Sequence, residues 1–421
     1  MKRALAFFCC LLGGSALADE SPPQVLSFRG YLNQVQTSNL DLLAQRYSVD
    51  IARAQVMAAK VFPDPVLSGG ISQVDVSGQA APLMSTLGLT LPLELGGKRS
   101  ARVDVAQREV SVAEAELDDA LRKLRAEAAQ AFVDALAARR VLLRKQQTLQ
   151  SLQRLVAVNE KRVQTGDIGE VALMQSRVES QHYRAEVVAA EGELRALEQS
   201  LRQYLGRAAP PREQAPQITG ELSLPPREFT LDALIEHASR ERPDVRARRM
   251  AMAASAARLR LAQRNRWIDV SLNVSWQRSL YSEPFASPQY DALSAILSLP
   301  LPFSRVYRGE VAAAEGGAAQ SQLGHQAAAL RAEVEVQQAL TRYQASVQQL
   351  AVYNTGLLAD AERVHAATLY SYQRGSATLL EVLNAQRTVD DVHLSYTAAL
   401  AAHAHQLIAV EQAAGIWDIE F

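Results

Sequence analysis

The chain has 421 residues, with 44 lysines and arginines against 45 aspartates and glutamates, and only 6% of its residues are aromatic. This near-neutral balance argues against a nucleic-acid-binding surface. Beyond residue 18 no run of 18 apolar residues occurs, so no transmembrane helix is expected. Few aromatic residues and abundant alanine are typical of long helices rather than of compact cores.

Residues 1–18 have the pattern of a secretory signal peptide. Two basic residues are followed by the apolar segment Ala4–Leu12 and by Ala16-Leu17-Ala18, an A-x-A cleavage site. Cys9 and Cys10, the two cysteines of the sequence, lie inside this segment. The mature chain is therefore predicted to have no thiol, no disulfide and no cysteine-ligated metal.

The mature chain repeats its own pattern. Asp64 and Asp269 begin similar strand-like segments 205 residues apart, and Gly166 and Gly375 follow similar helical segments 209 residues apart. A repeat of this size indicates a duplicated structural module. The predicted divisions are a first repeat over 19–205, a proline-rich linker over 206–228 and a second repeat over 229–421.

Each repeat is predicted to contain two strands, over 65–93 and over 268–303. Apolar residues alternate with small or polar ones from Leu87 to Leu93 and from Ile268 to Trp276. This alternation places the apolar side chains on one face. A tilted strand of about 10 residues is long enough to cross a bilayer, and alternating apolar and polar side chains are typical of strands in outer-membrane barrels. An ordinary antiparallel sheet with one wet face has the same pattern, so both alternatives stay open at this point.

Helical patterns flank the strands. A first helix is expected within 26–60. Residues 98–165 contain no proline or glycine, and their apolar residues recur every three or four positions, as in coiled coils. A helix of that length measures roughly 100 Å, more than a compact domain requires.

Glycine breaks at Gly166 and Gly375 are expected to turn the chain back on itself. We therefore predict long helical hairpins over 97–205 and 306–414, the second beginning with one continuous helix over 307–372. The linker between the repeats is expected to be a solvated loop, with a small packed belt around the helices as the alternative.

The number of strands has a consequence for assembly. In hydrocarbon, an open sheet edge leaves backbone groups unsatisfied at a cost of several kcal/mol each. Four strands cannot close a barrel alone, so strands that enter a membrane must pair with those of other copies. We therefore expect a cyclic homo-oligomer, with eight strands for two copies and twelve for three.

Several tracts together resemble one known family. They are Phe62-Pro63-Asp64-Pro65, the segment from Leu91 through Leu95-Gly96-Gly97-Lys98-Arg99, and Gly375 followed by Thr378-Leu379-Leu380-Glu381-Val382-Leu383. With the duplication, they resemble the TolC-type outer-membrane efflux proteins, and the Leu-Gly-Gly-Lys-Arg tract is most similar to the heavy-metal (CzcC-like) branch. The resemblance covers nearly the whole mature chain.

The resemblance implies a mostly α fold with a membrane β-barrel portion. Three copies would close a twelve-stranded barrel in the outer membrane and a helical tunnel through the periplasm. It also implies docking of the tunnel tip to a periplasmic adaptor protein and, through it, to an inner-membrane proton-driven transporter. The barrel would contact outer-membrane lipid, and no nucleic acid is expected as a partner.

By the same resemblance, the two glycine turns form the periplasmic tip. From Gly166 to Arg177 the first copy is one residue shorter than the second from Gly375 to Arg387, and it has Gly169-Glu170-Val171 where the second has a leucine pair, so equivalent docking of both is in question. The candidate tip and adaptor-contact residues are Gly166, Asp167, Gly169, Glu170, Gly375, Ser376, Leu380 and Glu381.

Charged residues near the turns are candidates for a gate. Repeated around a symmetric assembly, Asp167, Glu170 and Glu381 would form acidic rings that favour cations. They would equally suit the positive N-termini of the returning helices. Arginines nearby, Arg162 among them, are placed to latch a closed tip by salt bridges. The candidate gate residues are Asp167, Arg177, Arg374, Glu381 and Arg387.

We find no catalytic motif, and none is needed by a channel. Gly96-Gly97-Lys98 lacks the upstream glycine of a phosphate loop, and the histidines are scattered, so neither a cofactor nor a metal site is expected. The interpretation is a passive outer-membrane exit duct of a tripartite efflux pump for divalent heavy-metal cations. The alternatives are the channel of a drug pump or of a type I protein secretion system, and a periplasmic adaptor.

Overall fold

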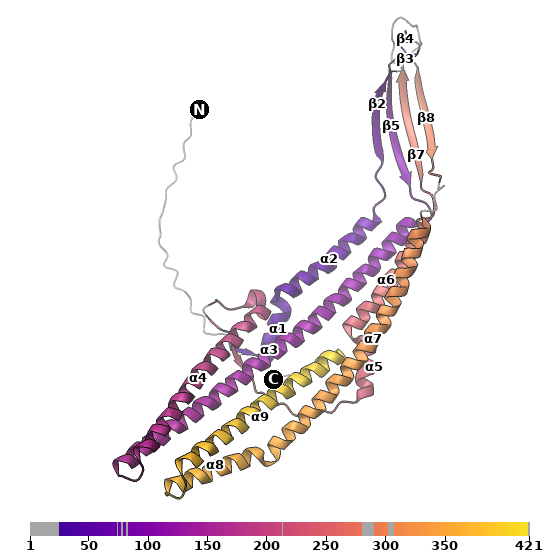
Figure 1. Ribbon diagram of the computed structural model, residues 1–421. Coiled ribbons are helices and arrows are strands. Elements are labelled where there is room, and N and C mark those ends of the chain that lie inside the picture. Colours follow the sequence, from indigo (N-terminus) through magenta and orange to yellow (C-terminus); the bar gives the residue numbers. More distant parts are fainter. Residues whose placement is uncertain are drawn as a thin grey trace, which may run out of the picture.

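The computed structural model describes residues 25–73, 75–76, 79–80, 83–212, 214–279, 290–301 and 307–419. The signal-peptide prediction for residues 1–18 lies outside the described residues. The described chain is an elongated body with a sheet at one end and two helical hairpins at the other (Figure 1). No helix within the described ranges is long and apolar enough to cross a membrane.

Four antiparallel strands form the sheet, two from each repeat. Their order is β2-β5-β7-β8, so β5 and β7 join the repeats in the middle while β2 and β8 are the edges. The strands are β2 (Val66–Ser72), β5 (Met84–Leu93), β7 (Val270–Ser279) and β8 (Asp291–Ser298). A two-residue ladder of β3 (Asp75–Val76) with β4 (Gln79–Ala80), which the sequence did not predict, lies between β2 and β5 in the chain.

The two faces of the sheet differ sharply in chemistry. Directly opposed residues on neighbouring strands share a face, so the register assigns every strand residue to one of the two faces. One face is apolar over most of its length, with rows such as Leu67, Leu89, Val274 and Ala295. The other consists mainly of small or uncharged polar residues. Its members are Val66, Ser68, Gly70, Ser72, Met84, Thr86, Gly88, Thr90, Pro92, Ser271, Asn273, Ser275, Gln277, Ser279, Ala292, Ser294, Ile296 and Ser298.

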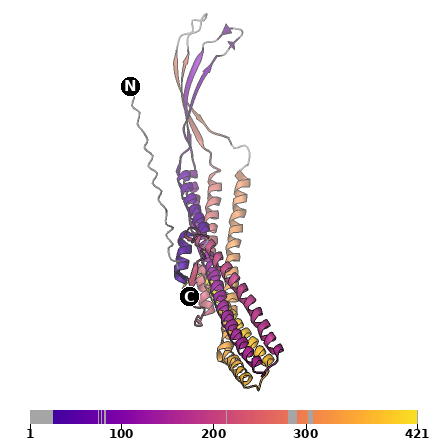
Figure 2. The ribbon, with the colours of Figure 1, turned by 90° about the vertical axis from the view of Figure 1, so that its left-hand side faces the viewer.

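Below the sheet, each repeat contains one long helix and shorter helices stacked along it (Figures 1 and 2). In the first repeat α3 (Lys98–Gln164) packs against α2 (Leu40–Lys60) near the sheet and against α4 (Glu170–Leu205) near the tip. The second repeat has α5 (Leu231–Glu241), α6 (Pro243–Arg264), α7 (Tyr307–Val352), α8 (Leu358–Gln373) and α9 (Leu379–Ala414).

Two joints hold the shorter helices end to end. The buried Asn39 amide donates to the terminal carbonyl of Tyr204 in α4 at 3.1 Å, while its oxygen accepts from the Leu42 amide of α2 at 3.0 Å. In the second repeat, the buried Arg242 guanidinium donates to the Ala413 carbonyl of α9 at 3.0 Å, just before α6 begins. Each joint supplies donors to carbonyls that a helix end leaves unsatisfied, so two short helices act as one long partner.

The linker forms a packed belt at mid-height. Its strand β6 (Gln217–Thr219) pairs in parallel with β1 (Val25–Ser27), ahead of α1 (Phe28–Ser38). Ile218 is buried in the main core, and its carbonyl accepts a hydrogen bond from Arg139 of α3 at 2.6 Å. The expectation of a solvated loop was therefore wrong, because the prolines direct an extended segment along the helices instead of releasing it into solvent.

Two helix predictions also need correction. The single helix expected within 26–60 is divided at Asn39, whose extended backbone lets it cap two helices. The single helix expected over 307–372 is interrupted by a π turn at Tyr353–Leu357, where Gly356 has φ 145°. Only glycine adopts such a backbone angle readily. The last strand ends at Ser298 rather than at 303, ahead of Pro300, and residues 302–306 lie outside the described ranges.

A buried carboxyl group holds the C-terminal segment against the belt. Glu411 of α9 is fully buried, and its carboxyl accepts from Arg227 of the linker at 3.1 Å and from the Asp418 amide at 3.0 Å. Arg227 also contacts the Asp418 carboxylate at 2.5 Å. Burial, reinforced by Asp418, raises the pKa of Glu411 from 4.5 to about 8.

This shift predicts a stability that falls with rising pH. The unfolded chain releases the Glu411 proton near pH 4.5, whereas the folded chain holds it up to about pH 8. The stabilisation is complete below the first value and is lost as pH rises through the second, at roughly 1 kcal/mol per pH unit in between. Glu411→Gln should flatten the pH dependence of the melting temperature in detergent between pH 5 and 8. The exposed Glu236→Gln should retain the wild-type slope, and a Glu411→Gln slope equal to wild type would refute the assignment.

Candidate functional site

The two hairpin tips lie together at the end of the molecule farthest from the sheet (Figures 1 and 2). Each is a tight glycine turn: Gly166 has φ 80° and Gly375 has φ 78°. The amides that follow reach back to the helix, from Asp167 to the Arg162 carbonyl at 2.8 Å and from Ser376 to the Ser371 carbonyl at 2.9 Å. The sequence-predicted turns are therefore built alike in the two repeats and have the same length, because five residues separate the helices in each, 165–169 and 374–378.

The predicted acidic residues mostly satisfy local helix ends. Glu381 and Thr378 form a reciprocal capping box at the start of α9, and these hydrogen bonds hold the pKa of Glu381 below its ordinary value. Asp167 accepts from the Thr165 hydroxyl at 2.8 Å, and Glu170 is the first residue of α4. Within the described residues of this one chain, no hydrogen bond or ion pair joins the three carboxylates to one another.

Two of the four predicted arginines connect the hairpins. Arg387 of α9 makes a double contact with Glu179 of α4 at 3.1 and 2.8 Å, and Arg162 of α3 donates to the Tyr372 carbonyl of α8 at 3.2 Å. The other two stay local. Arg177 pairs with Glu160 of its own hairpin at 2.6 Å, and Arg374 lies 4.5 Å from the centre of the Tyr370 ring.

The strongest link between the hairpins is a carboxylate that the sequence analysis did not single out. Asp390 of α9 is 2% exposed and accepts from both repeats. Arg144 and Thr148 of α3 donate to one oxygen, each at 2.7 Å, while Tyr183 of α4 and Gln386 of α9 donate to the other, each at 2.9 Å. We call these five residues the Asp390 cluster. Its sequence signal was a polar pair four residues apart, Gln386 and Asp390, inside the apolar seam of α9.

The π turn lies between this cluster and the belt. Its Tyr353 contacts Tyr396 of α9 with ring centres 5.6 Å apart, and the Tyr396 hydroxyl donates to Asn354 at 3.3 Å. Arg140 of α3 lies over the same Tyr396 ring at 5.5 Å. The non-helical backbone of Gly356 makes this turn a kink between α7 and α8, and such kinks interrupt the hydrogen-bond ladder of a helix. In the first repeat, α3 runs without such a break.

At the opposite end, the Leu95-Gly96-Gly97-Lys98-Arg99 tract forms the junction between sheet and helices. Gly96 has φ 70° and faces the Trp267 side chain so closely that a methyl group there would lie 2.4 Å from it. Lys98 pairs with Asp269 at 2.7 Å, which ties the exit of one strand pair to the start of the other. Arg99 donates to the Lys60 carbonyl at 2.6 Å and so caps the end of α2.

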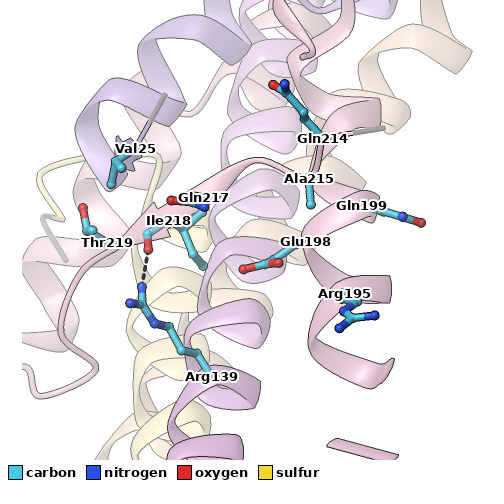
Figure 3. Close-up of a pocket in the computed structure, with 10 residues that line it drawn as sticks. All are labelled: Val25, Arg139, Arg195, Glu198, Gln199, Gln214, Ala215, Gln217, Ile218 and Thr219. Carbon is cyan, nitrogen blue, oxygen red and sulfur yellow. Dashed lines mark hydrogen bonds between the residues drawn. The ribbon is translucent and has the colours of Figure 1, made fainter. Parts of the chain in front are cut away.

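A hollow of about 860 Å³ lies beside the belt, between β6 and α4 (Figure 3). Its charged groups do not converge. Arg139 is committed to the Ile218 carbonyl, Arg195 extends on the far side of the hollow, and burial raises the pKa of Glu198. Among the described residues no group of three potential metal ligands occurs anywhere.

A comparison with family models decides the classification. The model described as "Outer membrane efflux protein" matches residues 31–207 and 234–416. The chain belongs to this family. It is an outer-membrane efflux channel that extends into the periplasm, and members of this family are ducts rather than enzymes.

The individual relatives agree with this classification. The cobalt-zinc-cadmium resistance protein CzcC of Cupriavidus metallidurans is 25% identical over 379 residues, covering 89% of this chain and 86% of CzcC. The crystal structure of CusC superposes with a TM-score of 0.75 at 21% identity, covering 94% and 93% of the two chains. The Campylobacter jejuni outer-membrane channel CmeC gives 0.77 at 14% identity, covering 99% and 93%. The predicted TolC-like fold, with its sheet left open in the single chain, is confirmed.

The Asp390 cluster makes a first prediction about the tips. Asp390→Ala would leave the Arg144 guanidinium without its buried partner, so we expect a loss of about 3–5 kcal/mol in stability. Amide hydrogen exchange should rise in α8 and α9 more than in α3. The matched change Asp360→Ala removes an exposed pair with Arg363 on the same hairpin and should cost under about 1 kcal/mol. Equal effects of the two substitutions would contradict the role assigned to the cluster.

Proposed function

We propose that this protein is the homotrimeric exit duct of a tripartite efflux pump. The observation that supports this proposal most strongly is the open sheet, which has one apolar face and unpaired edges at β2 and β8. Pairing β8 of one copy with β2 of the next is antiparallel, as the alternating strand directions require, and three copies close twelve strands. Ten-residue strands such as β5 and β7, tilted by about 40°, span an apolar band of roughly 25 Å.

The polar face of the sheet then lines the bore. Its side chains are hydroxyls, amides and small groups linked across strands, as in the Asn273–Thr90 contact at 2.8 Å and the Ser275–Ser294 contact at 2.8 Å. No charged residue lies on this face among the described strand positions. A wide, uncharged wall binds solutes weakly, which suits passage without retention. The duct is passive, and its energy comes from a proton-driven transporter in the inner membrane.

The hairpin tips are the proposed contact for a periplasmic adaptor. At the second position of each returning helix an apolar side chain is exposed, Val171 in α4 and Leu380 in α9, each at 64%. Exposed apolar side chains of this kind are suited to burial against a partner. Gly166, Gly169, Gly375 and Ser376 shape the turns beside them. The first tip has Val171 where the second has a leucine pair. Both tips therefore offer an apolar contact to the adaptor, but the two contacts differ in their side chains.

The gate is proposed to be shut at rest and opened by the adaptor. Arg387–Glu179, Arg162–Tyr372 and the Asp390 cluster tie the second hairpin to the first. These contacts must break before α8 and α9 move relative to α3. The π turn at Tyr353–Leu357 supplies a bending point in the second hairpin, on the belt side of the Asp390 cluster.

The cargo is proposed to be divalent heavy-metal cations. This rests on the relative named for cobalt-zinc-cadmium resistance and on the junction tract that resembles that branch. The channel of a drug pump or a type I secretion system remains the second candidate, since the uncharged polar face of the sheet does not by itself favour cations. A periplasmic adaptor is disfavoured because the chain has two hairpins and two strand pairs.

Deletion of the gene tests the cargo directly. We expect the deletion strain to become sensitive to Co²⁺, Zn²⁺ and Cd²⁺ with unchanged resistance to dyes and antibiotics, and plasmid-borne wild type to restore metal resistance. Sensitivity to drugs alone would assign the duct to a drug pump.

Conductance in planar bilayers tests the acidic tip. Glutamine is also accepted at this position of a capping box, so Glu381→Gln removes the charge while Glu381→Ala removes charge and cap. If the tip carboxylates select cations, both variants, each combined with Asp167→Asn, should lower the cation preference equally. If only the alanine variant differs from wild type, Glu381 acts as a helix cap and the acidic-ring proposal is wrong.

A further inference from the structure

Basic residues gather where the helices meet the sheet. Lys60 ends α2, Arg99 begins the first turn of α3, Arg264 ends α6, Arg266 follows it, and Arg308 lies in the first turn of α7. All four helix ends abut the base of the sheet (Figure 1). We call these five residues the basic collar.

The collar is not neutralised by the chain itself. Among the described residues, no carboxylate lies within 4.0 Å of Lys60, Arg264, Arg266 or Arg308, and these side chains are exposed or half-exposed. The carboxylates Glu94 and Asp269 are engaged by Arg102 and Lys98, each at 2.7 Å. Asp64 and Glu310 also lie at this level, so the five basic residues of the collar leave an excess of positive charge there. Cations left without partners beside an apolar surface indicate an external anion.

Two exposed aromatic side chains mark the same level. Phe62 is 64% exposed and Trp267 is 59% exposed. The Arg99 guanidinium lies 4.1 Å from the centre of the Phe62 ring, and its Nε alone is used, on the Lys60 carbonyl. Aromatic rings at the edge of an apolar band, with basic groups next to them, are typical of a membrane–water interface.

Among the described residues at the opposite end of the sheet, no such excess of positive charge occurs. There Arg278 of β7 and Asp291 of β8 are paired at 3.8 Å. The hairpins of an outer-membrane efflux channel extend into the periplasm, so the basic collar lies at the periplasmic leaflet. The charge asymmetry therefore distinguishes one leaflet from the other.

We propose that the basic collar binds the phosphate groups of anionic phospholipids in the periplasmic leaflet of the outer membrane. Arginine pairs with phosphate through two parallel N–H donors, and lysine supplies a point charge. Basic groups beside a bilayer surface attract anionic lipid in this manner. The inference depends on the outer-membrane location and is independent of the exported cargo. Its expected consequence is a trimer that anionic lipid stabilises.

The test is thermal unfolding of the purified trimer with added lipid. Phosphatidylglycerol should raise the melting temperature by several degrees more than phosphatidylcholine does. The triple variant Lys60→Gln/Arg264→Gln/Arg266→Gln should lose this difference while still forming trimers that conduct. Arg99 is left unchanged because it caps α2.

A second triple variant serves as the matched control. Arg154→Gln/Lys161→Gln/Arg184→Gln removes the same charge from exposed positions on the tip-side half of the molecule and should keep the wild-type response. Inorganic phosphate should not reproduce the shift, since the lipid also anchors its chains on the apolar face. The proposal is overturned if the collar variant responds to phosphatidylglycerol like wild type, if both triple variants lose the response alike, or if free phosphate stabilises as well as lipid. If the wild-type trimer itself did not conduct in planar bilayers, the proposed function as a duct would be contradicted instead.

Discussion

Unsatisfied backbone at the two sheet edges governs this molecule. The outer edges of β2 and β8 carry backbone donors and acceptors that no strand of the same chain pairs. Because one face of the sheet is apolar and suited to lipid, water is not available there to satisfy these groups. Hydrocarbon cannot satisfy those groups. The chain therefore folds as one segment of a wall, and the remaining features serve to bring identical segments together and to extend the wall into the periplasm.

The length of α3 determines how the other helices are arranged. A helix of 67 residues needs a partner along its whole length, yet the chain must also leave for the strands and return. In each repeat two shorter helices are stacked end to end to provide this partner, α2 with α4 and α6 with α9. A buried side chain caps each joint, Asn39 in the first repeat and Arg242 in the second. The joints lie near the belt, and Arg227 with Glu411 fixes the C-terminal segment there. In the proposed gate, motion is confined to the tip side, where the Asp390 cluster and the π turn lie.

Much of this was predictable from the sequence because the signals are local and periodic. Alternation identified β5 and β7, glycines identified both tips and so the returning helices α4 and α9, and the apolar rhythm identified α3. The duplicated order of elements, together with the tracts at 62–65, 91–99 and 375–383, then led to the family resemblance. The internal breaks were missed, since Asn39 and Gly356 interrupt otherwise regular helical patterns and act through contacts that depend on the fold.

The candidate site was predicted less completely. Sequence position placed the acidic and basic residues near the tips, but their partners follow from how two hairpins approach each other. Arg387 reaches Glu179 across 208 residues of sequence, and Asp390 reaches Arg144 across 246. Asp390 is buried whereas its neighbour Asp391 is exposed, and the position of Asp390 in the apolar seam of α9 does not by itself show that it meets Arg144 of the other repeat.

Cross-linking between edge strands tests the closed wall most directly. Cys9 and Cys10 lie within the predicted signal peptide, so the mature chain is expected to have no cysteine of its own and introduced cysteines should report without background. Ser68→Cys on β2 would be combined in turn with Ala292→Cys, Ser294→Cys and Ile296→Cys on β8, and oxidised in isolated outer membranes. The account predicts that at least one register gives covalent dimers and trimers that reductant returns to monomers. Absence of cross-links in every register, together with a detergent-free mature chain of single-copy mass in solution, would contradict it.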